Sequence, residues 1–319
     1  MATSSSKKVI FAALIGNTLI AIAKVVASAI TGSSAMLSEA IHSAVDTGNQ
    51  GLLLYGHKRA RVPADTKHPF GYGMELYFWS FIVAILIFGL GAGVSLYEGL
   101  HKVLAPEPIS NPTVNYIVLV LAMIFEAGSW FVAFQEFRKT KGARGILEAV
   151  RVSKDPSIFT VLFEDSAAML GLFTAFIGVG LAQVLALPVL DGVASIVIGL
   201  ILAGTATLLA FECKGLLIGE AADRSVVEGI RAIISAVPGV SARNELLTMH
   251  LGPRDVLLNL SLDFDDALSS REVESAISDM EHQIKTEFPE VTRVFIEAQS
   301  GAGHRREAKR QAEIRKASA

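Results

Sequence analysis

The sequence is poor in cysteine and in charged residues. Its 319 residues include one cysteine, Cys213, which excludes an internal disulfide framework and a CxxC metal site. Charged residues make up 18% of the chain, whereas soluble domains average about 25%. The net charge of −3 is too small to indicate a nucleic-acid partner. No Walker-type phosphate loop is present, so direct use of ATP is not supported.

Apolar residues are abundant and occur in long runs. They form 51% of the sequence, and the mean hydropathy is +0.48. Because a helix needs about 20 mainly apolar residues to cross a bilayer, the sequence predicts six membrane-spanning helices. These lie approximately at 9–30, 35–54, 76–100, 114–134, 157–185 and 187–217. The apolar runs then stop, which predicts a transmembrane domain at 1–219, a cytoplasmic domain at 220–300 and a polar tail at 301–319.

Basic residues in the short loops predict the orientation. They fall in the N-terminal segment and in the second-to-third and fourth-to-fifth loops, as Lys7, Lys8, Lys58, Arg59, Arg61, Lys67, Arg138, Lys139, Lys141, Arg144, Arg151 and Lys154. These three segments lie on one side when the number of spans is even, so the positive-inside rule places both termini in the cytoplasm. The lack of a transit peptide favours a bacterial inner membrane.

Several ionisable side chains fall inside the predicted spans, where each is a functional hypothesis. They are Glu39, His42, Asp46, Glu126, Glu164, Asp165 and Asp191. Glu39, near a span end, is interpreted as interfacial. Glu126 and Asp191 are equally compatible with proton transfer, helix packing and support of a nearby ligand.

His42 and Asp46 are four residues apart, so they share one helix face. An imidazole and a carboxylate at one point suit zinc. Glu164 and Asp165 are adjacent and diverge by about 100° around the next helix. Two ligands from each helix would make a four-coordinate nitrogen and oxygen site without thiolate. In the structural alternative, His42 hydrogen-bonds Asn17 or a carbonyl and Asp165 pairs with Lys24.

Three segments together resemble the cation diffusion facilitator family of zinc and related metal transporters. They are GSSAMLSEAIHSAVDTGNQ (32–50), DTKHPFGYGMELYFW (65–79) and FEDSAAMLG (163–171). The adjacent acids look most like the zinc transporter 9-like branch. The resemblance implies two i,i+4 ligand pairs from spans two and five: His42 and Asp46 match the first, and Asp165 matches the last position. The fourth position falls on Val161, so Glu164, about 60° away, substitutes or water completes the site.

The loop between spans two and three has two interpretations. Its Asp65 and His68, with His57 nearby, partly match a second metal site of some bacterial family members. The favoured alternative is a surface turn, because HPFGYG combines proline with two glycines.

The polar C-terminal region predicts the order helix, strand, strand, helix, strand. The elements fall at 225–236, 244–251, 255–263, from 270, and 291–298. This order resembles the family's cytoplasmic domain, which has a ferredoxin-like fold similar to that of metallochaperones. In relatives, this domain joins two copies of the transporter into a dimer. At the positions where many bacterial relatives carry metal-binding residues, this chain has Asn244, Ser261, Glu297 and Gln299, so a metal-free dimerisation domain is expected. The segment 301–319 is expected to be a solvated helix or tail.

The sequence thus predicts a six-helix membrane protein with a small C-terminal α+β domain and no resident cofactor. It would export Zn²⁺, or Fe²⁺, Co²⁺ or Mn²⁺, in exchange for protons, because metal and protons compete for the same basic groups. It would act as a homodimer formed through the C-terminal domain. Two alternatives stay open: an intramembrane enzyme that uses the adjacent carboxylates, and a metal-sensing or scaffold protein that has lost transport, which Val161 keeps open.

Overall fold

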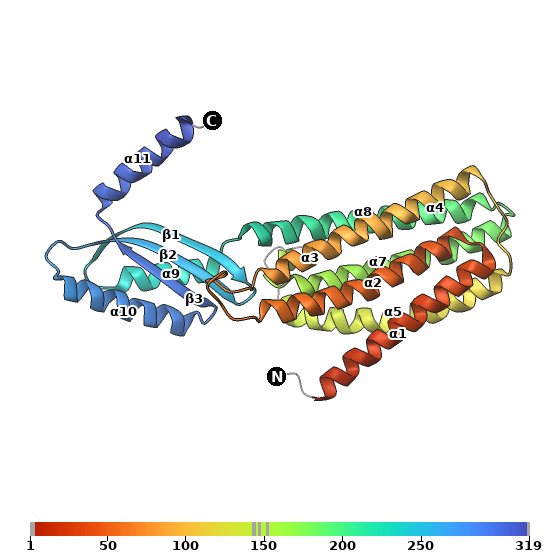
Figure 1. Cartoon of the computed structure of the whole chain (residues 1–319), viewed down its shortest axis with the longest axis horizontal. Coiled ribbons are helices and arrows are strands. Elements are labelled where there is room, and N and C mark those ends of the chain that lie inside the picture. Colours follow the sequence, from red (N-terminus) through yellow and green to blue (C-terminus); the bar gives the residue numbers. More distant parts are fainter. Residues whose placement is uncertain (1–3, 142–144, 146–147, 151–152, 318–319) are drawn as a thin grey trace. The chain divides into compact units, whose positions relative to one another are not determined.

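The chain divides into two compact units in the computed structural model (Figure 1). The structure describes residues 4–317 apart from 142–144, 146–147 and 151–152, so the predicted cytoplasmic residues Arg144 and Arg151 lie outside the described residues. The helical unit comprises Met1–Val62 and Glu75–Lys214, and the α/β unit comprises Pro63–Met74 and Gly215–Ala319. The loop that carries HPFGYG therefore groups with the C-terminal region.

The helical unit is a bundle of long helices that follows the predicted spans. Its elements are α1 (Ser4–Thr31), α2 (Ser34–Ala60), α3 (Glu75–Leu86), the π-helical η1 (Ile87–Ala92), α4 (Gly93–Leu104), α5 (Pro112–Lys141), α7 (Pro156–Val184) and α8 (Val189–Ile218). The segments α3, η1 and α4 follow one another without a break over the predicted third span. The prediction of a helical membrane domain is confirmed.

Membrane-spanning character is uneven among these helices. In the described part of the chain, four are long and apolar enough to cross a membrane: Glu75–Leu104, Pro112–Arg138, Pro156–Val184 and Val189–Ile218. Asn17–Thr31 of α1 is a shorter apolar helix. Helix α2 is 27 residues long but lower in hydropathy, because it carries the polar residues of the candidate site. Its contacts with α1, α3, α4 and α7 place it within the bundle.

The start of α2 is held by a carboxylate from another helix. Ser33 is the N-cap residue, and its hydroxyl accepts a bond from Met36 N. Asp191 of α8 accepts bonds from Ser33 Oγ (2.6 Å), Ser34 N (2.7 Å) and Ala35 N (3.4 Å). A negative charge is favourable at a helix N-terminus, where amide groups lack helical partners. Asp191 is fully buried. Its hydrogen bonds to the start of α2 match the helix-packing role, one of the three roles that the sequence left open.

The α/β unit has the predicted order of elements. It contains α9 (Arg224–Ala236), β1 (Val240–Gly252), β2 (Asp255–Phe264), α10 (Ser270–Glu287), β3 (Val291–Ala298) and α11 (Gly301–Ala317). The central strand, β2, pairs antiparallel with β1 and parallel with β3. Leu258 and Leu260 of β2 are buried with Ile230 of α9 and Ile284 of α10. These two helices thus share one core with the sheet; Figure 1 labels α9 and α10 beside the strands.

Candidate metal site between the second and fifth membrane helices

His42 and Asp46 form the α2 half of the candidate site. The four-residue spacing stacks them on one helix face, and His42 Nδ1 lies 3.3 Å from Asp46 Oδ1. His42 is 1% exposed. The 3.3 Å contact between His42 Nδ1 and Asp46 Oδ1 lacks the angles of a hydrogen bond. Among the described residues, Asp46 Oδ1 and both ring nitrogens of His42 therefore have no hydrogen-bond partner. Buried polar atoms without partners are unfavourable, so these atoms have unused capacity to bind a cation. The alternative bond from His42 to Asn17 is not formed.

Glu164 and Asp165 form the α7 half, and they face different neighbours. Glu164 Oε1 accepts a hydrogen bond of 2.7 Å from Asn49 Nδ2 of α2. Asp165 Oδ2 accepts one of 2.9 Å from Ser129 Oγ of α5. Both carboxyl groups belong to buried residues. The divergence expected of adjacent helical residues therefore directs one acid to α2 and the other to α5.

The two halves lie near each other, but they do not form a complete coordination site among the described residues. Asp46 is close enough to Glu164, Asp165 and Glu126 for their charges to interact. Among the residues that the structure describes, however, no three histidine, cysteine or acidic groups converge closely enough to hold one ion. A dication at this position would require Glu164 to leave Asn49 and Asp165 to leave Ser129. The arrangement therefore supplies nitrogen and oxygen atoms that can ligate a metal. Side-chain movements of Glu164 and Asp165 are needed to bring them around one ion.

Two charged residues near this site pair with each other. Lys24 of α1 is fully buried and donates to Glu39 Oε2 at 3.0 Å. The alternative pairing of Lys24 with Asp165 is therefore not formed. Glu39 is fully buried within the protein, while its expected depth near the membrane interface stays a prediction. Its partner Lys24 makes that burial tolerable, and sequence position alone does not reveal which charge a helix neighbour will supply.

The Asp65 loop has the geometry of a closed turn. Asp65 Oδ1 accepts bonds from His68 N (2.6 Å) and Lys67 N (2.9 Å), and Oδ2 accepts one from Tyr72 Oη (2.8 Å). These donors, His68 N first, lower the pKa of the Asp65 carboxyl from its ordinary value. The His68 ring packs beside Tyr72. Both oxygens of Asp65 thus serve the turn, as the favoured structural interpretation requires.

The polar cluster of the α/β unit is closed by its own hydrogen bonds. Asn244 Nδ2 donates to the Gln299 carbonyl oxygen at 2.7 Å, and Ser261 Oγ donates to Gln299 Oε1 at 3.3 Å. His304 Nδ1 lies 3.1 Å from the same Oε1. Neutral amide and hydroxyl groups therefore satisfy one another at positions where the resemblance places metal ligands in many bacterial relatives.

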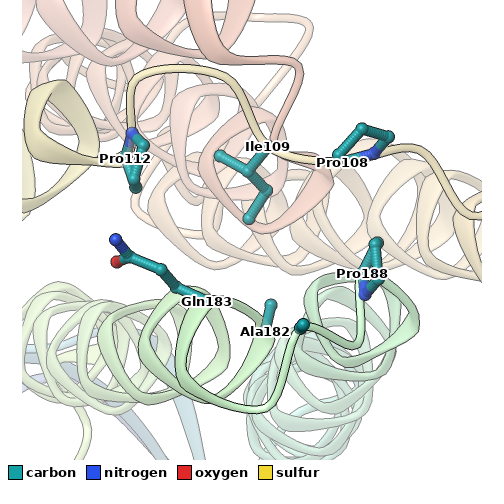
Figure 2. Close-up of a pocket in the computed structure, with 7 residues that line it drawn as sticks. Pro108, Ile109, Pro112, Ala182, Gln183 and Pro188 are labelled. Carbon is teal, nitrogen blue, oxygen red and sulfur yellow. The ribbon is translucent and has the colours of Figure 1, made fainter.

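A cavity of about 220 Å³ lies elsewhere in the helical unit, between the α4–α5 and α7–α8 connections (Figure 2). Its lining consists of Pro108, Ile109, Pro112, Ala182, Gln183, Ala186 and Pro188. Figure 2 shows Gln183 as its one polar side chain, extending toward the opposite connection. The cavity contains none of the candidate ligands, and its apolar lining offers no cation site.

A multi-pass helical bundle with buried ionisable groups on α2, α5 and α7 defines an integral membrane protein equipped to handle a cation. Comparison with known protein families supports this class of protein. The transmembrane domain of cation efflux proteins matches residues 10–218, and their cytoplasmic domain matches residues 222–299. The chain belongs to the cation efflux family, as the sequence resemblance predicted. That family consists of cation transporters and not of enzymes.

Several individual proteins that this chain resembles are named as metal or cation transport or tolerance proteins. The human mitochondrial proton-coupled zinc antiporter SLC30A9 is 33% identical over 83% of this chain and 47% of its own length. Metal tolerance protein C4 of Arabidopsis thaliana is 29% identical over 74% of this chain and 52% of its own length. Cation-efflux pump FieF of Cronobacter sakazakii is 25% identical over 87% of each chain. A solved nickel form of the MamM C-terminal domain covers 24% of this chain and 98% of its own, at 15% identity and a TM-score of 0.23. The chain spans about half the length of the SLC30A9 and C4 relatives.

Proposed function

We propose that this protein carries a divalent cation, Zn²⁺ first, out of the cytoplasm in exchange for protons. The observation that carries the proposal is His42, a buried histidine with both ring nitrogens unpartnered among the described residues, 3.3 Å from Asp46. Membership of the cation efflux family and the zinc antiporters among the relatives support it. Fe²⁺, Co²⁺ and Mn²⁺ are the alternative cargoes, since one imidazole with carboxylates also suits them.

The proposed ligands are His42 and Asp46 from α2 and Asp165 and Glu164 from α7. Glu164 replaces the ligand that is missing at Val161 by exchanging its bond with Asn49 for one with the metal. Deprotonated imidazole and carboxylates bind the dication, and protons occupy the same groups after it leaves. Proton exchange is thus a consequence of the ligand chemistry. The turn at Asp65 and His68 is proposed to be structural and not a second metal site.

The assembly and location are proposed on the same basis. The transmembrane domain at 1–219 would carry the transport site, the domain at 220–300 would join two copies into a homodimer, and 301–319 would be a polar tail. The match of residues 222–299 to the family's cytoplasmic domain supports this division. A bacterial inner membrane with both termini cytoplasmic is the proposed location; the named relatives include bacterial and mitochondrial proteins.

Zinc flux in proteoliposomes under a pH gradient tests the proposal. Wild-type protein should move zinc against its gradient at the expense of protons, and Asp46→Ala should reduce flux to the level of empty vesicles. Asp266→Ala, at an exposed position of the α/β unit, is the matched control and should keep wild-type flux. Wild-type flux in Asp46→Ala would reject the site. Zinc binding by the wild-type protein without flux would instead favour the sensing or scaffold alternative.

A further inference from the structure

Lys24 is a buried cation that the proposed transport chemistry does not use. Its side chain is 0% exposed, and Nζ lies 3.0 Å from Glu39 Oε2 and 2.7 Å from Ser43 Oγ. A lysine inside a membrane domain is unfavourable unless it is paired, and such residues usually belong to functional sites. The pair joins α1 to α2 and leaves the Lys24 ammonium among the buried groups of the bundle.

The α2 residues that contact Lys24 lie near the candidate ligands along the helix. Glu39 and Ser43 precede His42 and Asp46 by three residues each, the spacing that brings helical side chains together. Ser43, which accepts a bond from Lys24, directly follows His42 in the sequence. The charge of Lys24 is close enough to act on both His42 and Asp46. A dication bound there would therefore experience repulsion from Lys24 and attraction from Glu39.

Helix α7 borders the Glu39 carboxylate. Gly171 of α7 packs directly against Glu39 Oε1, and a Cβ atom at that position would overlap this oxygen. Glu39 is thus enclosed between Lys24 on one side and Gly171 on the other. Because Gly171 is on the helix that carries Glu164 and Asp165, the packing links the ion pair to both halves of the candidate site.

We propose that Lys24 and Glu39 are a positioning pair that sets the affinity of the neighbouring site for its dication. Lys24 weakens cation binding through its charge, and Glu39 holds the ammonium and offsets that charge. The consequence is an affinity low enough for release of the cargo. This inference rests on the proposed function, because it presupposes a dication at His42 and Asp46.

The two charges should shift zinc affinity in opposite directions, which a merely structural pair would not do. Glu39→Gln leaves the Lys24 charge without compensation, and the zinc dissociation constant should rise by about tenfold or more at the effective dielectric of a protein. Lys24→Met removes the repulsion, so the dissociation constant should fall. Lys24→Met combined with Glu39→Gln should return it toward the wild-type value.

Isothermal titration of zinc into purified full-length protein in lipid nanodiscs measures these constants. Lys24→Arg keeps the charge and should retain wild-type affinity, which separates charge from side-chain identity. A thermal unfolding transition measured for each variant tests whether that variant is folded. Should one single charge variant fail to fold, the other single charge variant and Lys24→Arg decide the matter.

Shifts of the same sign in Glu39→Gln and Lys24→Met, or unchanged affinity in both, would overturn the inference. So would a shift opposite to the expected one in the remaining charge variant, or altered affinity in Lys24→Arg, if those two variants have to decide. A failure of the proposed function has a different result: the wild-type protein itself would bind no zinc, or Asp46→Ala would bind it as well as wild type.

Discussion

Two polar clusters of this protein, one in each unit, differ in how completely they satisfy themselves. In the α/β unit, Asn244 and Ser261 direct their hydrogen bonds to Gln299. In the helical unit, His42 and Asp46 Oδ1 have no hydrogen-bond partner among the described residues. Both clusters are made of nitrogen and oxygen groups, but the α/β cluster consists of neutral amides and a hydroxyl, whereas His42 and Asp46 are ionisable. They also differ in unused bonding capacity, and the two differences together indicate where a cation has most to gain.

The same comparison separates two acids within the helical unit. Asp191 is buried and accepts bonds from the N-terminus of α2, whereas Asp46 faces other acids and His42. A satisfied acid holds the structure together, and an unsatisfied one is available to a ligand. Substitutions should therefore affect folding at one acid and transport at the other.

The largest expected effect on stability comes from Asp191→Ala. It removes a charged acceptor from amide and hydroxyl donors at the start of α2, and the free energy of unfolding should fall by about 3 kcal/mol or more. Unfolding of the detergent-solubilised protein, followed by helical circular dichroism, measures the change. Asp191→Asn retains one acceptor oxygen and should lose less. A fully stable Asp191→Ala protein that lacks only transport would contradict the structural assignment.

A smaller loss is expected when the closed cluster of the α/β unit is opened. Gln299→Ala removes the side-chain acceptor of Ser261 and should lower the free energy of unfolding by about 1–2 kcal/mol. Gln283→Ala, which removes an exposed bond to Glu287 on α10, is the matched control and should change it by about 0.5 kcal/mol or less. Zinc stoichiometry, measured by equilibrium dialysis, should stay the same in both. A loss of bound zinc in Gln299→Ala would show that the cluster holds metal.

The smallest effect concerns the start of α10. Ser269 and Glu272 form a capping box, so Ser269→Ala should destabilise the unit by about 1 kcal/mol. Bonds from Ser269, its backbone N–H first, lower the pKa of Glu272 below its ordinary 4.5. The contribution of the Glu272 carboxylate is therefore present above pH 4.5 and lost as the pH falls through the lowered value. Denaturant unfolding at a series of pH values should show the difference between variant and wild type narrowing in acid; a constant difference would argue against the capping role.

Much of the architecture follows from the sequence alone. Hydropathy predicts the most apolar helices, because apolar length is a local property, whereas α2 is lower in hydropathy. Alternation along β2 predicts its buried face. The first strand begins at Val240, earlier than the predicted 244, because pairing with β2 extends it through residues without apolar alternation. The grouping of Pro63–Met74 with the α/β unit was not predicted either, since it depends on packing between distant segments.

The candidate site is predictable in its residues and not in its partners. His42, Asp46, Glu164 and Asp165 stand out because ionisable groups are unfavourable in lipid. The bonds from Asn49 to Glu164 and from Ser129 to Asp165 depend on how the helices face one another. The pairing of Lys24 with Glu39 has the same origin, and a lone lysine in an apolar run was the only signal that could have indicated it.

X-ray absorption at the zinc edge tests the central claim most directly, because it reports the atoms around the bound ion. The zinc-loaded wild-type protein should show one imidazole, oxygen ligands and no sulfur. His42→Ala should lose the imidazole contribution, while His250→Ala, in the α/β unit, should keep it. An imidazole contribution that survives in His42→Ala, or a sulfur ligand from Cys213, would contradict the site described here.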